Sequence, residues 1–256
     1  MTGVRRLPSI AAALGAALLL ASGPAARAAE GLYLTWDECA LSGLANHNRV
    51  NICSSNIGGQ DLFVAFRLAQ PADSVLGLEI VVDVQHADAV MPDWWQLGSG
   101  GCRSGALVPS FDFSIYTTCA DFMGGQAAGG LQGYFVGQPR GGANQARIKM
   151  AAAFLPSVGY ATLNADDLYY GARMNFQNIY TVAPGPVCAG CPDAACLVLN
   201  SIWVKRQPGA IGGDVYVTVP GPGNANFATW QGGAGADCAA VPVRPVTWGR
   251  VKSLYR

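Results

Sequence analysis

Two adjacent tryptophans are the residues of this chain best suited to binding chemistry. Trp94 and Trp95 follow a predicted strand over residues 76–85. Because neighbouring residues of an extended chain point to opposite faces, we expect one indole to fill the core and the other to be exposed. An exposed indole is a flat platform with a polar N–H, which suits it to stacking on sugar rings. Tyr169, beside Tyr170, is a third candidate by the same argument; the alternative is that both tryptophans seal one end of the fold.

Catalytic side chains are scarce. The chain has only two histidines, His47 and His86, and no Gly-x-Ser-x-Gly motif. A glycosidase needs two carboxylates about 5–9.5 Å apart, whereas Glu79 and Asp83, on one face of one predicted strand, are about 13 Å apart. We therefore predict a non-catalytic exported module that acts in binding, with a glycan as the candidate ligand, or in surface structure. The alternative is a secreted carboxylate-dependent hydrolase of the glycosidase type, whose acids come from different strands.

One turn is rich in oxygen ligands. Asn164, Asp166 and Asp167 precede a predicted strand over residues 168–176, and calcium binds six to eight oxygens of this kind. They are the candidate calcium ligands, and calcium is the one cofactor that the sequence suggests. The alternative is an ordinary turn, since Asn and Asp are also common turn residues.

Eight cysteines predict a framework of disulfide bonds in an exported protein. From proximity in the chain we expect Cys39 to pair with Cys53, and Cys102 with Cys119. We expect Cys238 to pair with one member of the group formed by Cys188, Cys191 and Cys196, which leaves one local bridge inside that group. The Cys-x-x-Cys motif within it is typical of redox and zinc sites as well, but its Pro-rich surroundings and an exported location favour structural bridges.

The first 28 residues have the pattern of a secretory signal peptide. Arg5 and Arg6 precede an apolar run over residues 10–21, and Ala26-Arg27-Ala28 fits the small-x-small cleavage motif. We predict cleavage after Ala28 and a single secreted domain over residues 29–256, located outside the cell, on its surface or in the periplasm. The apolar run is shorter than the about 20 residues of a membrane span. The basic C-terminal segment, residues 248–256, is a candidate sorting signal.

The composition is nearly neutral and apolar. Lysine and arginine equal aspartate and glutamate, at 16 each, and charged residues make up 12% of the chain. The absence of a basic stripe argues against a nucleic-acid partner. The expected partners are an extracellular glycan or a cell-surface protein, with no membrane span.

The hydrophobic pattern predicts β-strands. Apolar residues alternate with polar ones over residues 76–85 and 168–176, as in half-buried strands, and further strands are expected, residues 111–116 among them. Residues 121–133 are expected to hold at most a short turn or helix, because glycines interrupt them. Gly- and Pro-rich turns separate the short strands, which is typical of sandwiches and barrels. We predict an all-β, antiparallel β-sandwich, of jelly-roll or immunoglobulin/cohesin-like type, stapled by disulfides and with at most one or two short helices.

Several passages resemble uncharacterised secreted bacterial proteins. They include Pro92-Asp93-Trp94-Trp95-Gln96, the Cys-x-x-Cys motif with the strand that follows it, and the ending Trp248-Gly249-Arg250-Val251-Lys252. The strand pattern is also loosely similar to cohesin-like and carbohydrate-binding sandwiches. The resemblance implies export and a β-sandwich, and it supplies no catalytic residues.

Overall fold

The computed structural model describes residues 29–154 and 159–238. The predicted signal peptide and the C-terminal segment 248–256 lie outside these residues. Within them, no helix is both long and apolar enough to cross a membrane.

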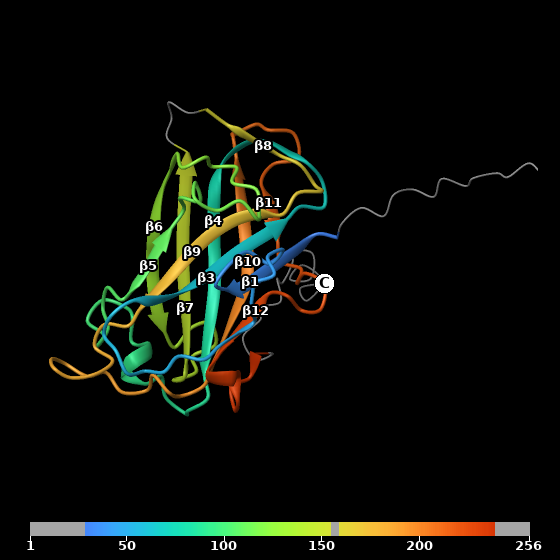
Figure 1. Ribbon diagram of the computed structural model, residues 1–256. Coiled ribbons are helices and arrows are strands. Elements are labelled where there is room, and N and C mark those ends of the chain that lie inside the picture. Colours follow the sequence, from blue (N-terminus) through green and yellow to red (C-terminus); the bar gives the residue numbers. More distant parts are fainter. Residues whose placement is uncertain (1–28, 155–158, 239–256) are drawn as a thin grey trace, which may run out of the picture.

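Two β-sheets face each other, and the strands of the smaller sheet cross in front of those of the larger one (Figure 1). Sheet A has four strands, in the order β1 (Gly31–Trp36), β3 (Gly59–Arg67), β9 (Tyr169–Gln177) and β5 (Leu107–Ser110). The path of sheet B runs through β2 (Asn48–Arg49), β12 (Phe227–Trp230), β10 (Ala195–Arg206), β4 (Ala72–His86), β7 (Gln145–Phe154) and β6 (Ala127–Val136). Off this path, β11 (Val215–Val217) pairs with β10, and β8 (Ala161–Leu163) pairs with β4.

The predicted fold class is confirmed. Paired strands are antiparallel, apart from β2 and β12, which are parallel. In the described chain the helical elements are two short 3-10 helices, η1 (Asp93–Trp95) and η2 (Gln231–Gly233). Both lie at the lower end of the sandwich in Figure 1.

The main core lies between the sheets and follows the alternation of the strands. In β4, Leu78, Ile80, Val82 and Val84 are all buried on the inner face, as the sequence predicts. Removing such apolar surface from water contributes about 25 cal/mol per Å² and is the main stabilising term of the fold.

Strand β9 differs from its prediction as a half-buried strand. Tyr169 and Ala172 face the main core, whereas Tyr170 belongs to a second apolar cluster on the opposite, outer face of sheet A. Residues 111–119 cover this outer face. The strand predicted over residues 111–116 is therefore wrong: this segment is a loop, and its Phe113 packs on the sheet.

The glycine-rich segment 121–133 is also corrected. It contains a turn, but strand β6 begins at Ala127 and pairs with β7 from Ala127 to Val136, with one irregularity between Leu131 and Gly133. β6 is an edge strand, where glycines are tolerated. At Gly129 a glycine is also required, because a Cβ there would clash with the backbone of Ala151 and Ala152 on β7.

The four disulfides join segments distant in sequence. They are Cys39–Cys119, Cys53–Cys191, Cys102–Cys188 and Cys196–Cys238. The predicted partner of Cys238 within the Cys188–Cys196 group is confirmed. The predicted bridges Cys39–Cys53 and Cys102–Cys119, and the local bridge, are wrong. Proximity in sequence failed because the tertiary packing of distant segments, and not loop length, decides which cysteines meet.

Candidate functional site

Both tryptophans of the predicted platform are buried. Trp94 and Trp95 are each 0% exposed, and the indole of Trp94 lies 4.9 Å from that of Trp230, between ring centroids. The indole Nε1–H of Trp94 donates a hydrogen bond to Thr181 Oγ1, at 3.1 Å. The expected exposed indole is wrong because the pair lies in the 3-10 helix η1, and not in an extended strand with alternating faces.

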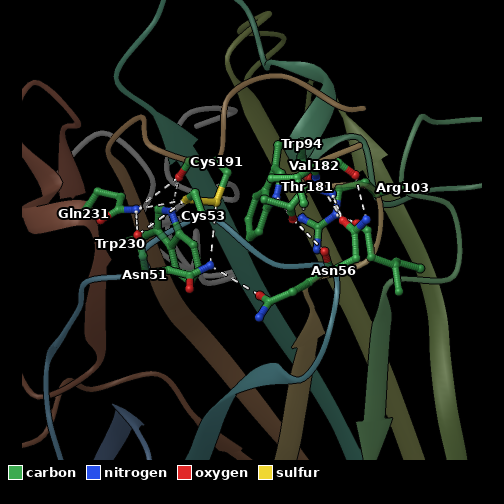
Figure 2. The surroundings of a disulfide bond; sticks show 12 residues. Asn51, Cys53, Asn56, Trp94, Arg103, Thr181, Val182, Cys191, Trp230 and Gln231 are labelled. Atoms are coloured by element: carbon green, nitrogen blue, oxygen red, sulfur yellow. Dashed lines mark hydrogen bonds between the residues drawn. A yellow bond between two sulfur atoms is a disulfide. The ribbon is translucent and has the colours of Figure 1, made fainter. Parts of the chain in front are cut away.

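A buried arginine, which the sequence analysis missed, holds this end of the sandwich together (Figure 2). The guanidinium of Arg103 donates hydrogen bonds to the carbonyls of Trp94, at 2.7 Å, Ile179, at 3.1 Å, and Gln177. Its carbon lies 3.5 Å from the centroid of the Trp94 ring. Burial lowers the pKa of Arg103 to about 9, so the group stays charged at neutral pH. These contacts show that Trp94 and Arg103 stabilise the fold at this end of the sandwich.

The disulfide Cys53–Cys191 lies beside this cluster (Figure 2). Gln231 donates hydrogen bonds to the carbonyls of Asn51, at 2.7 Å, and Cys191, at 3.3 Å. The indole N–H of Trp230 donates to the same Cys191 carbonyl, at 2.8 Å. Cys191, the second cysteine of the Cys-x-x-Cys motif, is thus held in a disulfide with its carbonyl hydrogen-bonded. This agrees with the prediction that the cysteines of the motif form structural bridges.

Tyr169, the third predicted ligand contact, is also buried, with 3% of its surface exposed. Its hydroxyl donates to Asp167 Oδ2, at 3.1 Å, and accepts from the backbone N–H of Asn164, at 2.6 Å. The side-chain amide of Asn164 donates to the same Asp167 oxygen, at 3.1 Å. Asn164 and Asp167 therefore stabilise the turn itself, while Asp166 is exposed; calcium binding there remains a prediction.

The open surface lies elsewhere, on the outer face of sheet B. A groove of about 570 Å³ crosses this face. Strands β4, β6, β7 and β10 line it, together with β11 and the residue that follows it. The side chains at its surface include Glu79, Gln132, Lys149, Ser201, Trp203 and Tyr216.

An aromatic pair forms one wall of the groove. Trp203 of β10 lies directly opposite Tyr216 of β11 in the antiparallel register, with ring centroids 5.3 Å apart. Tyr216 is 57% exposed and Trp203 is partly exposed. Trp203 and Tyr216 therefore have the exposed ring surface that was predicted for Trp94 or Trp95.

A β-bulge places Trp203 on the outer face. The register between β10 and β4 shifts between Leu199 and Ser201, so the inner face changes from Leu197 and Leu199 to Ile202 and Val204. Simple alternation would place Trp203 on the inner face, the same face as Leu199. The sequence signal for the bulge is weak: a polar Asn200 within an apolar strand.

Asn200 is part of a buried polar network under the groove. Asp83 of β4 is 0% exposed and accepts two hydrogen bonds from Arg147, Nε to Oδ1 at 2.7 Å and Nη2 to Oδ2 at 2.8 Å. The Asn200 amide donates to the same carboxylate. Burial raises the pKa of Asp83, and the neighbouring Arg147 opposes that shift. The network fixes the floor of the groove, because each removed partner would leave a buried polar group unpaired.

Lys205 contacts both an aromatic ring and two carboxylates at the groove. Its ammonium lies 2.6 Å from the centroid of the Trp203 ring, 3.2 Å from Glu79 Oε1 and 3.9 Å from Asp214 Oδ2. Glu79 is the one carboxylate among the described lining residues of the groove. Lys205 therefore covers one face of Trp203, and the groove combines the remaining aromatic surface with hydrogen-bonding groups. Asp214 also contacts Lys205, but it is not among the residues that line the groove.

The groove continues over small residues. A shallower depression of about 280 Å³ shares Glu79, Gln132 and Ala151 with it and is lined further by Gly77, Gly129 and Ala153. Small side chains let a ligand approach the sheet closely. The two depressions adjoin at these shared residues, and together their lining residues come from β11, β10, β4, β7 and β6.

Comparisons of the chain with protein families, with curated proteins and with solved structures find no match.

Proposed function

We propose that this protein is a non-catalytic exported module that binds a glycan chain along the groove of sheet B. The observation that carries the proposal is the pair Trp203 and Tyr216, which are at least partly exposed and lie side by side in the groove. Aromatic faces stack on the apolar faces of sugar rings, while their polar edges remain available to hydrogen bonds. Trp203 and Tyr216 replace Trp94, Trp95 and Tyr169 as contact residues.

The remaining groups of the groove suit the hydroxyls of a sugar. Glu79 accepts hydrogen bonds, Lys149 donates them, and Ser201 and Gln132 do both. Binding sites of this kind place a few polar groups around an apolar surface. The small-residue depression beyond Ala151 leaves room for a chain that extends past the aromatic pair.

Hydrolysis receives less support from the same surface. A glycosidase needs an acid and a second carboxylate on either side of the bond. Glu79 is the only carboxylate among the described groove-lining residues, and it is paired with Lys205. The groove geometry therefore favours binding without cleavage over the hydrolase alternative.

An exported location is part of the proposal. Four disulfides in the described chain are typical of oxidising compartments, and the N-terminal sequence has the pattern of a secretory signal. A place outside the cell, on its surface or in the periplasm would expose the groove to polysaccharide.

Affinity electrophoresis in gels containing soluble β-glucan, xylan, galactomannan or pectin tests the proposal. We expect retardation by at least one polymer, and a loss of affinity of about tenfold or more for Trp203→Ala and for Tyr216→Ala. Tyr160→Ala is the matched control, because Tyr160 is 55% exposed and lies outside the groove; it should behave as wild type.

Two results would overturn the proposal. One is the absence of retardation by every polymer; the other is equal retardation of Trp203→Ala, Tyr216→Ala and wild type. A reducing-sugar assay on the same polymers separates the hydrolase alternative. Release of sugar by wild type, abolished in Glu79→Gln, would support the hydrolase over the binding module.

A further inference from the structure

The last described residue, Cys238, is fixed to the outer face of sheet B. It forms a disulfide with Cys196, the second residue of β10. Cys196 and Val198 lie on the outer face, because Leu197 between them faces the main core. Cys238 packs against both of these outer residues. The chain after Cys238 therefore starts from the same face of the sheet that carries the groove.

The groove lies within reach of the residues that follow. Along β10, Trp203 is seven residues from Cys196, which is about 23 Å at the rise of a strand. Trp248 is ten residues from Cys238 in the sequence, and an extended chain of that length spans about 33 Å. Residues 239–256, which lie outside the described part of the chain, are thus long enough to bring an aromatic ring to the wall of the groove.

Among the described residues, the outer face of sheet B is the one with open aromatic surface. On sheet A the segment 111–119 covers the strands, and Phe113 stacks on Tyr170. On sheet B, Tyr216 is exposed and Trp203 is partly exposed. Covering these two rings removes apolar surface from water, which favours a segment that packs on them.

The sequence of residues 239–256 suits an extended segment with aromatic anchors. Pro242 and Pro245 alternate with valines, and proline disfavours a helix at and before its own position. Trp248 and Tyr255 follow. Such rings pack in edge-to-face or offset arrangements on other aromatic rings, and the groove offers two of them.

Charge attracts this segment to the rest of the chain. Residues 29–238 contain nine lysines and arginines against all sixteen aspartates and glutamates, a formal charge of −7. Residues 239–256 contain four basic residues and no acidic one. At the groove itself the charges nearly balance, since Glu79 and Asp214 lie beside Lys205 and Lys149 lines the same surface. The net charge therefore favours return of the segment to the sandwich, while the aromatic rings favour the groove as its position.

We propose that residues 239–256 dock along the outer face of sheet B, with Trp248 in the groove against Trp203 and Tyr216. The Cys196–Cys238 disulfide keeps the segment at a high local concentration, so a weak contact suffices to hold it there. A docked segment would compete with a glycan for the same two rings. This competition rests on the proposed function, whereas the docking does not.

Photo-crosslinking within the full chain tests the docking. The photoreactive residue p-benzoylphenylalanine replaces Trp248, the exported protein is irradiated, and mass spectrometry of its peptides locates the crosslinks. We expect intramolecular crosslinks to residues 200–218 of the groove. The matched control carries the same probe in place of Ile115, which is exposed on the cover of sheet A, and should give no crosslink to these residues.

Two variants sharpen this measurement. Trp203→Ala combined with Tyr216→Ala should lower the yield of groove crosslinks at least fivefold, whereas Tyr160→Ala should leave it unchanged. Arg244→Glu combined with Arg250→Glu changes no residue of the described sandwich and should lower the yield about threefold. The docking is overturned if irradiation gives no crosslink, crosslinks to sheet A, or crosslinked dimers, which would place the segment on a second copy. A yield that neither double variant lowers would also overturn it.

Glycan retardation tests the competition separately. In the affinity gels, Trp248→Ala should bind the retarding polymer at least threefold more tightly than wild type, because the groove is freed. Equal retardation of the two would overturn the competition. Crosslinks at the groove without retardation by any polymer would support the docking and overturn the glycan proposal, and retardation without groove crosslinks would do the reverse.

Discussion

The outer faces of the two sheets both carry aromatic side chains, but the described residues cover only one of these faces. On sheet A, residues 111–119 lie over the strands, and Phe113 stacks on Tyr170 with ring centroids 4.5 Å apart and planes 7° apart. The Cys39–Cys119 disulfide ties this cover to the loop after β1. On sheet B, Trp203 and Tyr216 border an open groove.

The difference shows that residue type alone does not assign a role to an aromatic ring. A covered ring contributes to stability by leaving water, whereas a ring on an open face remains available to a ligand. The two kinds of tryptophan make the same point, since Trp94 is fully buried and Trp203 is partly exposed. If the covered face is structural and the open face is functional, substitutions on the first should change stability and substitutions on the second should change binding.

The largest effect is expected from the disulfide that holds the cover. Cys39→Ala combined with Cys119→Ala removes a bridge between residues 80 positions apart. On the chain-entropy model the free energy of unfolding should fall by about 4–5 kcal/mol, as measured by denaturant unfolding without reductant. Glycan retention by the folded fraction should not change. A loss below about 1 kcal/mol would mean that the disulfide does not stabilise the cover.

Phe113→Ala tests the cover without touching a disulfide. Phe113 is 1% exposed, so its removal leaves a cavity and should lower the free energy of unfolding by about 3–5 kcal/mol. Ile115→Ala is the control within the same segment; because Ile115 is 82% exposed, a change within about 0.5 kcal/mol is expected. Equal effects of the two variants would contradict the packing described for this face.

Trp203→Ala should separate stability from binding. With the ring partly exposed, we expect a loss of about 1 kcal/mol in the free energy of unfolding together with the loss of glycan retention. Trp94→Ala should show the opposite pattern: a destabilisation of about 3–5 kcal/mol and normal retention by the folded protein. If both variants behaved alike in both assays, the distinction between buried and exposed tryptophans would carry no functional meaning.

The smallest effect is expected for the ion pair at the groove. Glu79→Gln removes the 3.2 Å contact with Lys205, whose side chain is 29% exposed while that of Glu79 is 50% exposed. Pairs accessible to solvent contribute about 0–1 kcal/mol and are weakened by salt. The free energy of unfolding of wild type and variant, measured at low and high salt, should differ by less than about 1 kcal/mol. A difference larger than this would make Glu79 part of the structure of the open face.

The sequence predicts well which strand residues lie in the core, because burial follows the alternation of apolar and polar residues along a strand. The apolar alternation of β4 places Ile80 and Val82 in the core, and turn residues mark where strands end. The candidate site was predicted less well: the chemistry of exposed aromatic rings was recognised, but at Trp94, Trp95 and Tyr169, which the fold encloses. Local pattern does not reveal what another segment covers.

By itself the sequence determined the all-β class, the alternating core of β4 and an even set of cysteines able to form disulfides. Only the tertiary structure decided the remaining features, because each depends on contacts between distant segments. The packing of distant segments brought Cys39 to Cys119, on the outer face of sheet A, and Cys53 to Cys191. The bulge at Asn200, bonded to Asp83, reversed the faces of β10 and turned Trp203 outward. Side-chain alternation is a local property, whereas register and cover are set by partners far along the chain.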